Sequence, residues 1–124
     1  MKQLVLAAAW LTVTAAPLCA AAAPLTTAPI ELSGGDRCLQ CTAANVGRRE
    51  VTVQFIAAKG NGAAEDHGTS TLSPGEATYR TIACGEVGNF ACRFEVLSGG
   101  RKNVRAASCD FQSLVGCRAA SAAQ

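Results

Sequence analysis

RCLQCTAANVG, residues 37–47, carries two cysteines at CxxC spacing inside a stretch of alternating side chains. Such a pair is typical of a zinc site, of a redox centre, or of two separate disulfides. In a β-strand, residues three apart face opposite sides, so Cys38 and Cys41 would have different partners. Leu39 and Ala43 share the face of Cys41, which places this cysteine in the core. The stretch therefore predicts a half-buried strand linked by disulfides.

The metal and redox alternatives find less support in the remaining cysteines. Cys84 and Cys92 are eight residues apart, as are Cys109 and Cys117, and neither spacing is that of a zinc knuckle. A redox CxxC is expected at the start of a helix, whereas this one lies within a strand pattern. The sequence favours disulfides, and it predicts no metal and no cofactor.

The N-terminal residues have the pattern of an export signal. Lys2 is followed by an apolar stretch at 4–16 and then by a run of alanines. The apolar stretch is short for a membrane span, so we predict a signal peptide over 1–22, cleaved near residues 20–23. The alternative is a retained membrane anchor. Cleavage would leave a secreted or periplasmic protein without a transmembrane span.

Removal of this signal changes the charge and the cysteine count. Ten basic residues remain against nine acidic ones, and the net charge near +1 gives no reason to expect nucleic acid as a partner. Cys19 leaves with the signal, so six of the seven cysteines remain. An even number in a short exported chain indicates a disulfide framework.

Strand alternation also suggests how the six cysteines pair. Cys92 alternates with Phe90 and Phe94, so it lies on an apolar face as Cys41 does. Two inward cysteines on an early and a late strand fit a bridge across the core. The predicted pairs are Cys41–Cys92, Cys109–Cys117 across a short hairpin and, for the two that are left, Cys38–Cys84.

Short alternating runs separated by turn residues predict the fold class. The clearest strand candidates are residues 38–46, 51–58, 76–83, 89–96 and 102–111. Asn-Gly, Pro-Gly and Gly-Gly pairs lie between them. We expect an all-β domain of about seven strands over residues 31–119, in the form of a sandwich. Residues 23–30 are expected to be a flexible N-terminal segment, and residues 120–124 a frayed C-terminus.

Three pieces of the chain resemble a known group of proteins. They are CTAANVGRREVTVQFI at 41–56, TLSPGE at 71–76 and CRFEVLSGGRKNVRA at 92–106. Together they resemble small exported bacterial proteins with one immunoglobulin-like or fibronectin-III-like β-sandwich. The resemblance implies an Ig-like antiparallel sandwich and brings no catalytic residue. The core tryptophan of antibody domains is missing, because Trp10 lies in the signal.

His67, the only histidine, is the first candidate for catalytic chemistry. It follows Glu65 and Asp66 in AAEDHGTS, residues 63–70. This group is either a metal or acid–base site or a polar loop between strands, and one histidine without a partner favours the loop. No GxSxG, P-loop or GxGxxG motif is present. We therefore predict no catalytic, cofactor-binding or metal-binding residue and expect the protein not to be an enzyme.

A basic patch is the other candidate site. It would consist of Arg93, Arg101, Lys102 and Arg105, provided that the strands carrying Arg93 and Arg105 are neighbours. Such a patch would contact an anionic polymer or lipid headgroups. The alternative, which the sequence favours, is ordinary solvated charge partly offset by Glu95.

These observations favour an exported, non-enzymatic binding or structural module with three disulfides. Its partner would be an unknown protein or a surface polymer, bound at an exposed sheet edge or at residues 98–105. One alternative is a secreted enzyme inhibitor or effector that uses the rigid SGGRKN loop. The other is a metal- or thiol-handling periplasmic protein, which would have free thiols or a bound metal.

Overall fold

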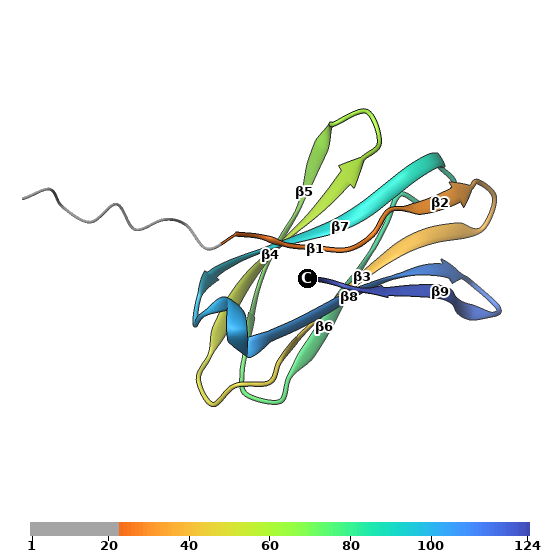
Figure 1. Ribbon diagram of the computed structural model, residues 1–124. Coiled ribbons are helices and arrows are strands. Elements are labelled where there is room, and N and C mark those ends of the chain that lie inside the picture. Colours follow the sequence, from red (N-terminus) through yellow and green to blue (C-terminus); the bar gives the residue numbers. More distant parts are fainter. Residues whose placement is uncertain (1–22) are drawn as a thin grey trace, which may run out of the picture.

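The computed structural model describes residues 23–124, and the predicted signal peptide, residues 1–22, lies outside the described residues. Within residues 23–124 the chain forms nine strands and one 3₁₀ turn (Figure 1). In chain order these are β1 (Leu25–Thr26), β2 (Ile30–Ser33), β3 (Arg37–Asn45), β4 (Val51–Lys59), β5 (Ala64–Leu72), β6 (Ala77–Ile82), β7 (Val87–Ser98), η1 (Arg101–Asn103), β8 (Val104–Gln112) and β9 (Gly116–Ala122). No helix in this part of the chain is long and apolar enough to cross a membrane.

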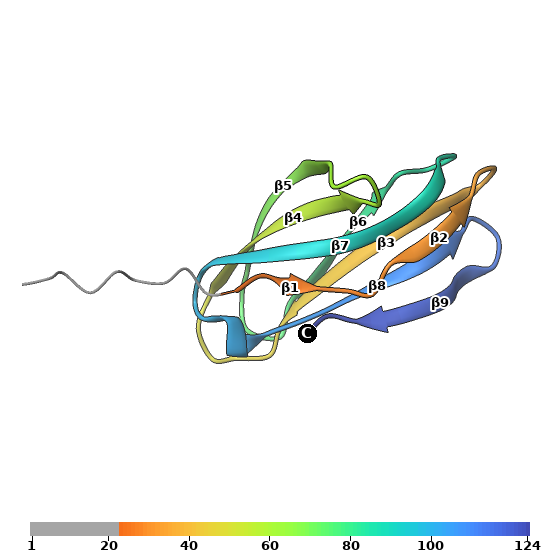
Figure 2. The same ribbon diagram turned by 45° about the horizontal axis from the view of Figure 1, so that its top comes forward.

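The strands form two antiparallel sheets that pack face to face (Figure 2). Sheet A has the order β1-β7-β4-β5, with β2 also pairing with β7, and sheet B has the order β6-β3-β8-β9. The all-β expectation is confirmed, and the five clearest strand candidates all form strands. The described chain has nine strands where about seven were expected.

Alternation produces the core, because each central strand buries every second residue between the sheets. Leu39, Cys41 and Ala43 of β3 face the core from sheet B, as the opening stretch predicted. Phe55 and Phe94 face it from sheet A, with ring centroids 5.5 Å apart in an edge-to-face arrangement. Such pairs add a specific geometry to the burial of apolar area.

Both ends of the domain are more ordered than predicted. Leu25, in the segment expected to be flexible, is buried and lies opposite Phe94. At the other terminus β9 continues to Ala122, so the residues expected to be frayed are largely paired. Thr26 and Gln124 exchange two backbone hydrogen bonds, of 3.1 and 3.2 Å. The edge strands β1 and β9 thus close one side of the sandwich together.

The three disulfides have the pairing that the sequence suggested. Cys41–Cys92 joins β3 to β7 and so connects the two sheets through the core. Cys38–Cys84 and Cys109–Cys117 lie on the outer face of sheet B, where they join neighbouring segments. Only the first of these bridges therefore links the sheets to each other.

The strand order does not confirm an immunoglobulin-like arrangement. In constant-type domains the sheets contain strands ABED and CFG, and a disulfide joins B to F. If β3 and β7 correspond to the bridged strands B and F, then β8 corresponds to strand G and would pair with β7. The first strands, β1 and β2, would correspond to strand A and would pair with β3. Instead, β8 pairs with β3, while β1 and β2 pair with β7. Relative to the immunoglobulin fold, the first strands, β1 and β2, and the late strand β8 have thus exchanged sheets.

Candidate functional site

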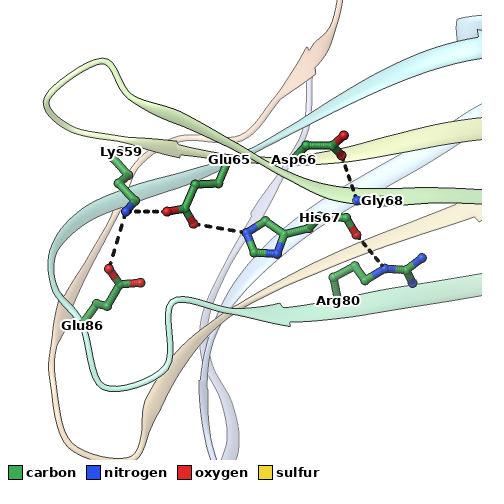
Figure 3. Close-up of polar contacts among 7 residues, drawn as sticks. All are labelled: Lys59, Glu65, Asp66, His67, Gly68, Arg80 and Glu86. Carbon is green, nitrogen blue, oxygen red and sulfur yellow. Dashed lines mark hydrogen bonds and ion pairs between the residues drawn. The ribbon is translucent and has the colours of Figure 1, made fainter.

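One candidate site lies where the edge strands β5 and β6 meet on the open side of the sandwich. The stretch around His67 was predicted to be a loop, but it forms β5. Glu65 lies opposite the core residue Ala57, so Glu65 and, two residues on, His67 point to the inner face of sheet A. Lys59 lies opposite the buried Phe90 and points the same way. We call Lys59, Glu65, His67, Arg80 and Glu86 the β5–β6 cluster (Figure 3).

The charges of this cluster are paired with one another. The ammonium group of Lys59 lies 2.8 Å from Glu65 Oε1 and 3.7 Å from Glu86 Oε1. The hydrogen bond with Lys59 and its positive charge hold the pKa of Glu65 below its ordinary value, and the hydrogen bond with Glu65 raises the pKa of Lys59. His67 Nε2 lies 3.5 Å from Glu65 Oε2 without hydrogen-bond geometry.

Arg80 of β6 connects the two edge strands through hydrogen bonds to β5. Its Nε donates a 3.2 Å hydrogen bond to His67 O, and its Nη2 donates a 2.6 Å hydrogen bond to Ser70 Oγ. The guanidinium also lies 4.8 Å from the centroid of the Phe55 ring. An inward-pointing charge on an edge strand hinders pairing with another chain.

Side-chain contacts also occupy part of the free edge of β5. Gly68 N donates a 2.8 Å hydrogen bond to Asp66 Oδ1, which lowers the pKa of this carboxyl group, and His67 O is bonded to Arg80. An added strand would need free backbone groups at these positions. The middle of β5 is therefore a poor site for a partner strand.

These contacts use the charges of the cluster within the fold. A carboxylate whose pKa is lowered by an ammonium partner is a weak general base at neutral pH. The hydroxyl of Ser70 accepts a hydrogen bond from a guanidinium. Within residues 23–124 no three His, Cys, Asp or Glu residues are placed to hold a metal ion. The cluster is best explained as a structural closure of the sandwich.

Two shallow grooves lie beside the cluster, at the turn between β4 and β5. The larger has a volume of about 470 Å³, and its lining includes Pro29, Ala58 and Ala91. The smaller, of about 260 Å³, includes Glu86 and Asn89 in its lining. Lys59 lines both grooves, but its charge is already paired with carboxylates.

A buried ion pair is the polar feature that the sequence reasoning missed. Asp110 of β8 is 3% exposed, accepts a 3.0 Å hydrogen bond from Arg37 Nε and forms an ion pair with the same guanidinium. Alternation along β8 from Val104 would have placed Asp110 on the inner face. Both carboxylate oxygens of Asp110 contact Arg37, so the buried carboxylate has its polar partner within the fold.

The predicted basic patch is only partly assembled. Arg101, Lys102 and Arg105 lie together, because Arg105 Nη1 donates a 3.1 Å hydrogen bond to Lys102 O. Arg93 lies on the outer face of sheet A, where it pairs with Glu95 at 3.1 Å. Arg105 lies on the outer face of sheet B, so the condition that their strands are neighbours is wrong.

The structure instead adds Arg48 and Arg49 to this group. Figures 1 and 2 show the β3–β4, β5–β6 and β7–β8 connections at one end of the sandwich. The first carries Arg48 and Arg49, and the last carries Arg101 and Lys102. We call these four residues together with Arg105 the basic end.

Asn45 links the β3–β4 connection to the β5–β6 connection. Its side chain is 1% exposed, donates hydrogen bonds to Arg49 O at 2.7 Å and Leu72 O at 3.0 Å, and accepts one from Gly47 N at 2.9 Å. Its backbone oxygen accepts a 2.9 Å hydrogen bond from Gly75 N. One buried amide therefore fixes the backbone that carries the arginines of the first connection.

Close packing fixes the first and third connections against each other. Val46 N donates a 2.8 Å hydrogen bond to Asn103 O. A Cβ on Gly47 would lie 2.7 Å from Asn103 Cγ, and one on Gly99, where φ is 88°, would lie 2.5 Å from Glu50 O. Both glycines are needed for this approach, since a real Cβ does not come so close.

Comparisons with known proteins add information on the fold alone. No protein-family model and no curated protein matches this sequence. The crystal structure of Thermotoga maritima 1070 is similar, with a TM-score of 0.57 and 9% identity over 85% of this chain and 95% of that one. The class defined by these observations is a disulfide-linked, two-sheet all-β domain. The resemblance to small exported bacterial proteins stays a prediction.

Proposed function

We propose that this protein is an exported, non-enzymatic binding module that contacts an anionic partner through its basic end. The carrying observation is the placement of Arg48, Arg49, Arg101, Lys102 and Arg105 on adjoining segments at one end. Within residues 23–124, none of these five side chains takes part in an ion pair. Unpaired, exposed guanidinium groups suit bidentate contacts with carboxylate, phosphate or sulfate oxygens.

Export is the other part of the proposal. Three intramolecular disulfides fit an oxidising compartment. Mass spectrometry of the protein from the exported fraction should find a chain that starts near residues 20–23 and contains no free thiol. A chain retained in the cytoplasm with reduced cysteines would contradict export.

Retention on a polyanionic matrix tests the binding role. The wild-type protein should elute from dextran sulfate at higher salt than the double variant Arg48→Glu/Arg101→Glu, because the variant reverses two charges of the basic end. Arg118→Glu is the matched control, since Arg118 is exposed on β9 and lies near the opposite end. Equal elution of all three proteins would remove the basic end from the proposal.

The two alternatives are less well supported by the contacts. A thiol-handling role needs reduced cysteines, and the six within residues 23–124 are all bonded in pairs. An inhibitor that uses residues 98–103 shares its surface with the basic end. Inhibition of an enzyme that persists in Arg48→Glu/Arg101→Glu would favour a backbone-mediated inhibitory loop over the proposed role.

A further inference from the structure

The charges of the domain are separated by position. The β3–β4, β5–β6 and β7–β8 connections together with Arg105 have the five residues of the basic end and two acidic residues, Glu50 and Glu76, which gives this end of the domain a net charge of +3. The remainder of residues 23–124 has five basic and seven acidic residues, a net charge of −2. A nearly neutral protein thus presents one strongly positive end, and its field would orient the molecule toward a negatively charged surface.

The shape of the basic end suits an extended surface better than a small ligand. Its five basic side chains are exposed, and they come from two connections and the start of β8. The two grooves described above line the β4–β5 turn and include none of these five residues. Discrete anions are usually bound in concave sites, whereas peripheral membrane contact requires only clustered charge on a projecting surface.

An apolar side chain lies among these charges. Val46 is 56% exposed and directly precedes the segment that carries Arg48 and Arg49. At the interface of an anionic bilayer, buried apolar area adds to the attraction between basic residues and lipid headgroups. A polysaccharide chain would gain little from this valine.

The start of the fold lies on the same side. Because β1 is antiparallel to β7, with Leu25 opposite Phe94, residue 23 extends toward the end of β7 that leads to η1 (Figures 1 and 2). The mature chain expected after cleavage near residues 20–23 would therefore begin at this end of the domain.

From these observations we infer that the partner of the basic end is a lipid surface that contains anionic phospholipids. The inference rests on the proposed function and narrows its anionic partner to lipid phosphate groups. Each Lys or Arg near such a surface adds to the attraction, and the exposed valine adds a small apolar contact. The interaction should weaken with salt, since exposed charges are screened.

Co-sedimentation with vesicles tests the inference, using the exported protein with its disulfides intact. Wild-type protein should bind vesicles of phosphatidylcholine mixed with phosphatidylglycerol and not vesicles of phosphatidylcholine alone. Arg101→Glu should bind the anionic vesicles at least about fivefold more weakly, because reversal removes one attractive charge and adds a repulsive one. Val46→Ser should weaken binding less, and Arg118→Glu should bind as the wild type does. Circular dichroism and the denaturation midpoint show whether each variant is folded.

The outcomes separate this inference from the proposed function. Retention on dextran sulfate without vesicle binding would overturn the lipid partner and leave a soluble anionic polymer as the ligand. Equal binding to neutral and anionic vesicles would also overturn it, since charge would then play no part. Failure to bind both the matrix and the vesicles would remove the proposed function as well.

Discussion

The β5–β6 cluster and the basic end are both rich in charge, but their charges are used differently. In the cluster, Lys59 contacts two carboxylates and Arg80 contacts the backbone and a hydroxyl of the neighbouring strand. At the basic end, the chain's contacts fix the backbone and leave the guanidinium groups of Arg48 and Arg101 without an ion pair within residues 23–124. Charges that satisfy one another stabilise the fold, whereas fixed charges without partners are available to a ligand.

The largest effect is expected from the residue that supports the basic end. Asn45→Ala removes three side-chain hydrogen bonds from a buried site and leaves two carbonyl groups without their donor. We expect a loss of about 3 kcal/mol in the free energy of unfolding, measured by urea denaturation. Asn61→Ala is the matched control, because Asn61 makes the same type of contact to Ala63 N in an exposed turn. Equal losses of unfolding free energy in both variants would show that the buried hydrogen bonds of Asn45 contribute no more than those of an exposed turn.

A smaller effect is expected at the cluster. Arg80→Met keeps the apolar stem near Phe55 and removes the hydrogen bonds to β5 and the cation–π contact. We expect a loss of about 1–2 kcal/mol, because these contacts are only partly buried. The freed edge of β5 should also make the variant more prone to aggregate, which light scattering would detect. Arg118→Met, the control, should change the stability by less than about 0.5 kcal/mol.

The sequence predicted the central strands because their inward positions are apolar. It missed β5 because the inward positions of this edge strand before Leu72 are Glu65, His67 and Ser70, so no alternation of hydrophobicity marks it. The strand β1, with only two residues, is too short to show a period, and β9 consists mostly of small residues. These three strands owe their position to tertiary pairing at the edges, which no local pattern encodes.

The disulfides could be predicted, and the assembly of the basic end could not. Alternation assigns a residue to one face of its own strand, which was enough to pair Cys41 with Cys92. It does not say which sheet a strand joins, and for this reason Arg93 and Arg105 were wrongly expected to be able to share a surface. Likewise, Arg48 and Arg101 are far apart in the sequence and are brought together only by the topology of three connections.

The ion pairs of the cluster predict a dependence of stability on pH. The pKa of Glu65 is lowered in the folded state by Lys59, so its contribution is present above the unfolded pKa and is lost as the pH falls through the folded value. The denaturation midpoint of Glu65→Gln should thus lie slightly below that of the wild type at neutral pH and approach it in acid. For Lys59, whose pKa is raised, the contribution is lost only in strong alkali, above about pH 10.5.

Glu31→Gln is the control for this pH series. It removes an exposed carboxylate of β2 for which residues 23–124 provide no ion pair. The difference in denaturation midpoint between Glu31→Gln and the wild type should be the same at each pH. A pH-independent difference for Glu65→Gln would show that its contacts to Lys59 are not electrostatic.

The smallest effect on stability is expected where the effect on binding is largest. Arg101→Glu reverses a charge that has no ion pair in the described chain, so the free energy of unfolding should change by less than about 0.5 kcal/mol. Lys59→Glu is the same reversal in the cluster, where it would place a third carboxylate beside Glu65 and Glu86 and measurably lower the denaturation midpoint. If Arg101→Glu destabilised the protein as much as Lys59→Glu, the charges of the basic end would have partners in the fold. They would then be structural, and the reason to assign them to a ligand would be lost.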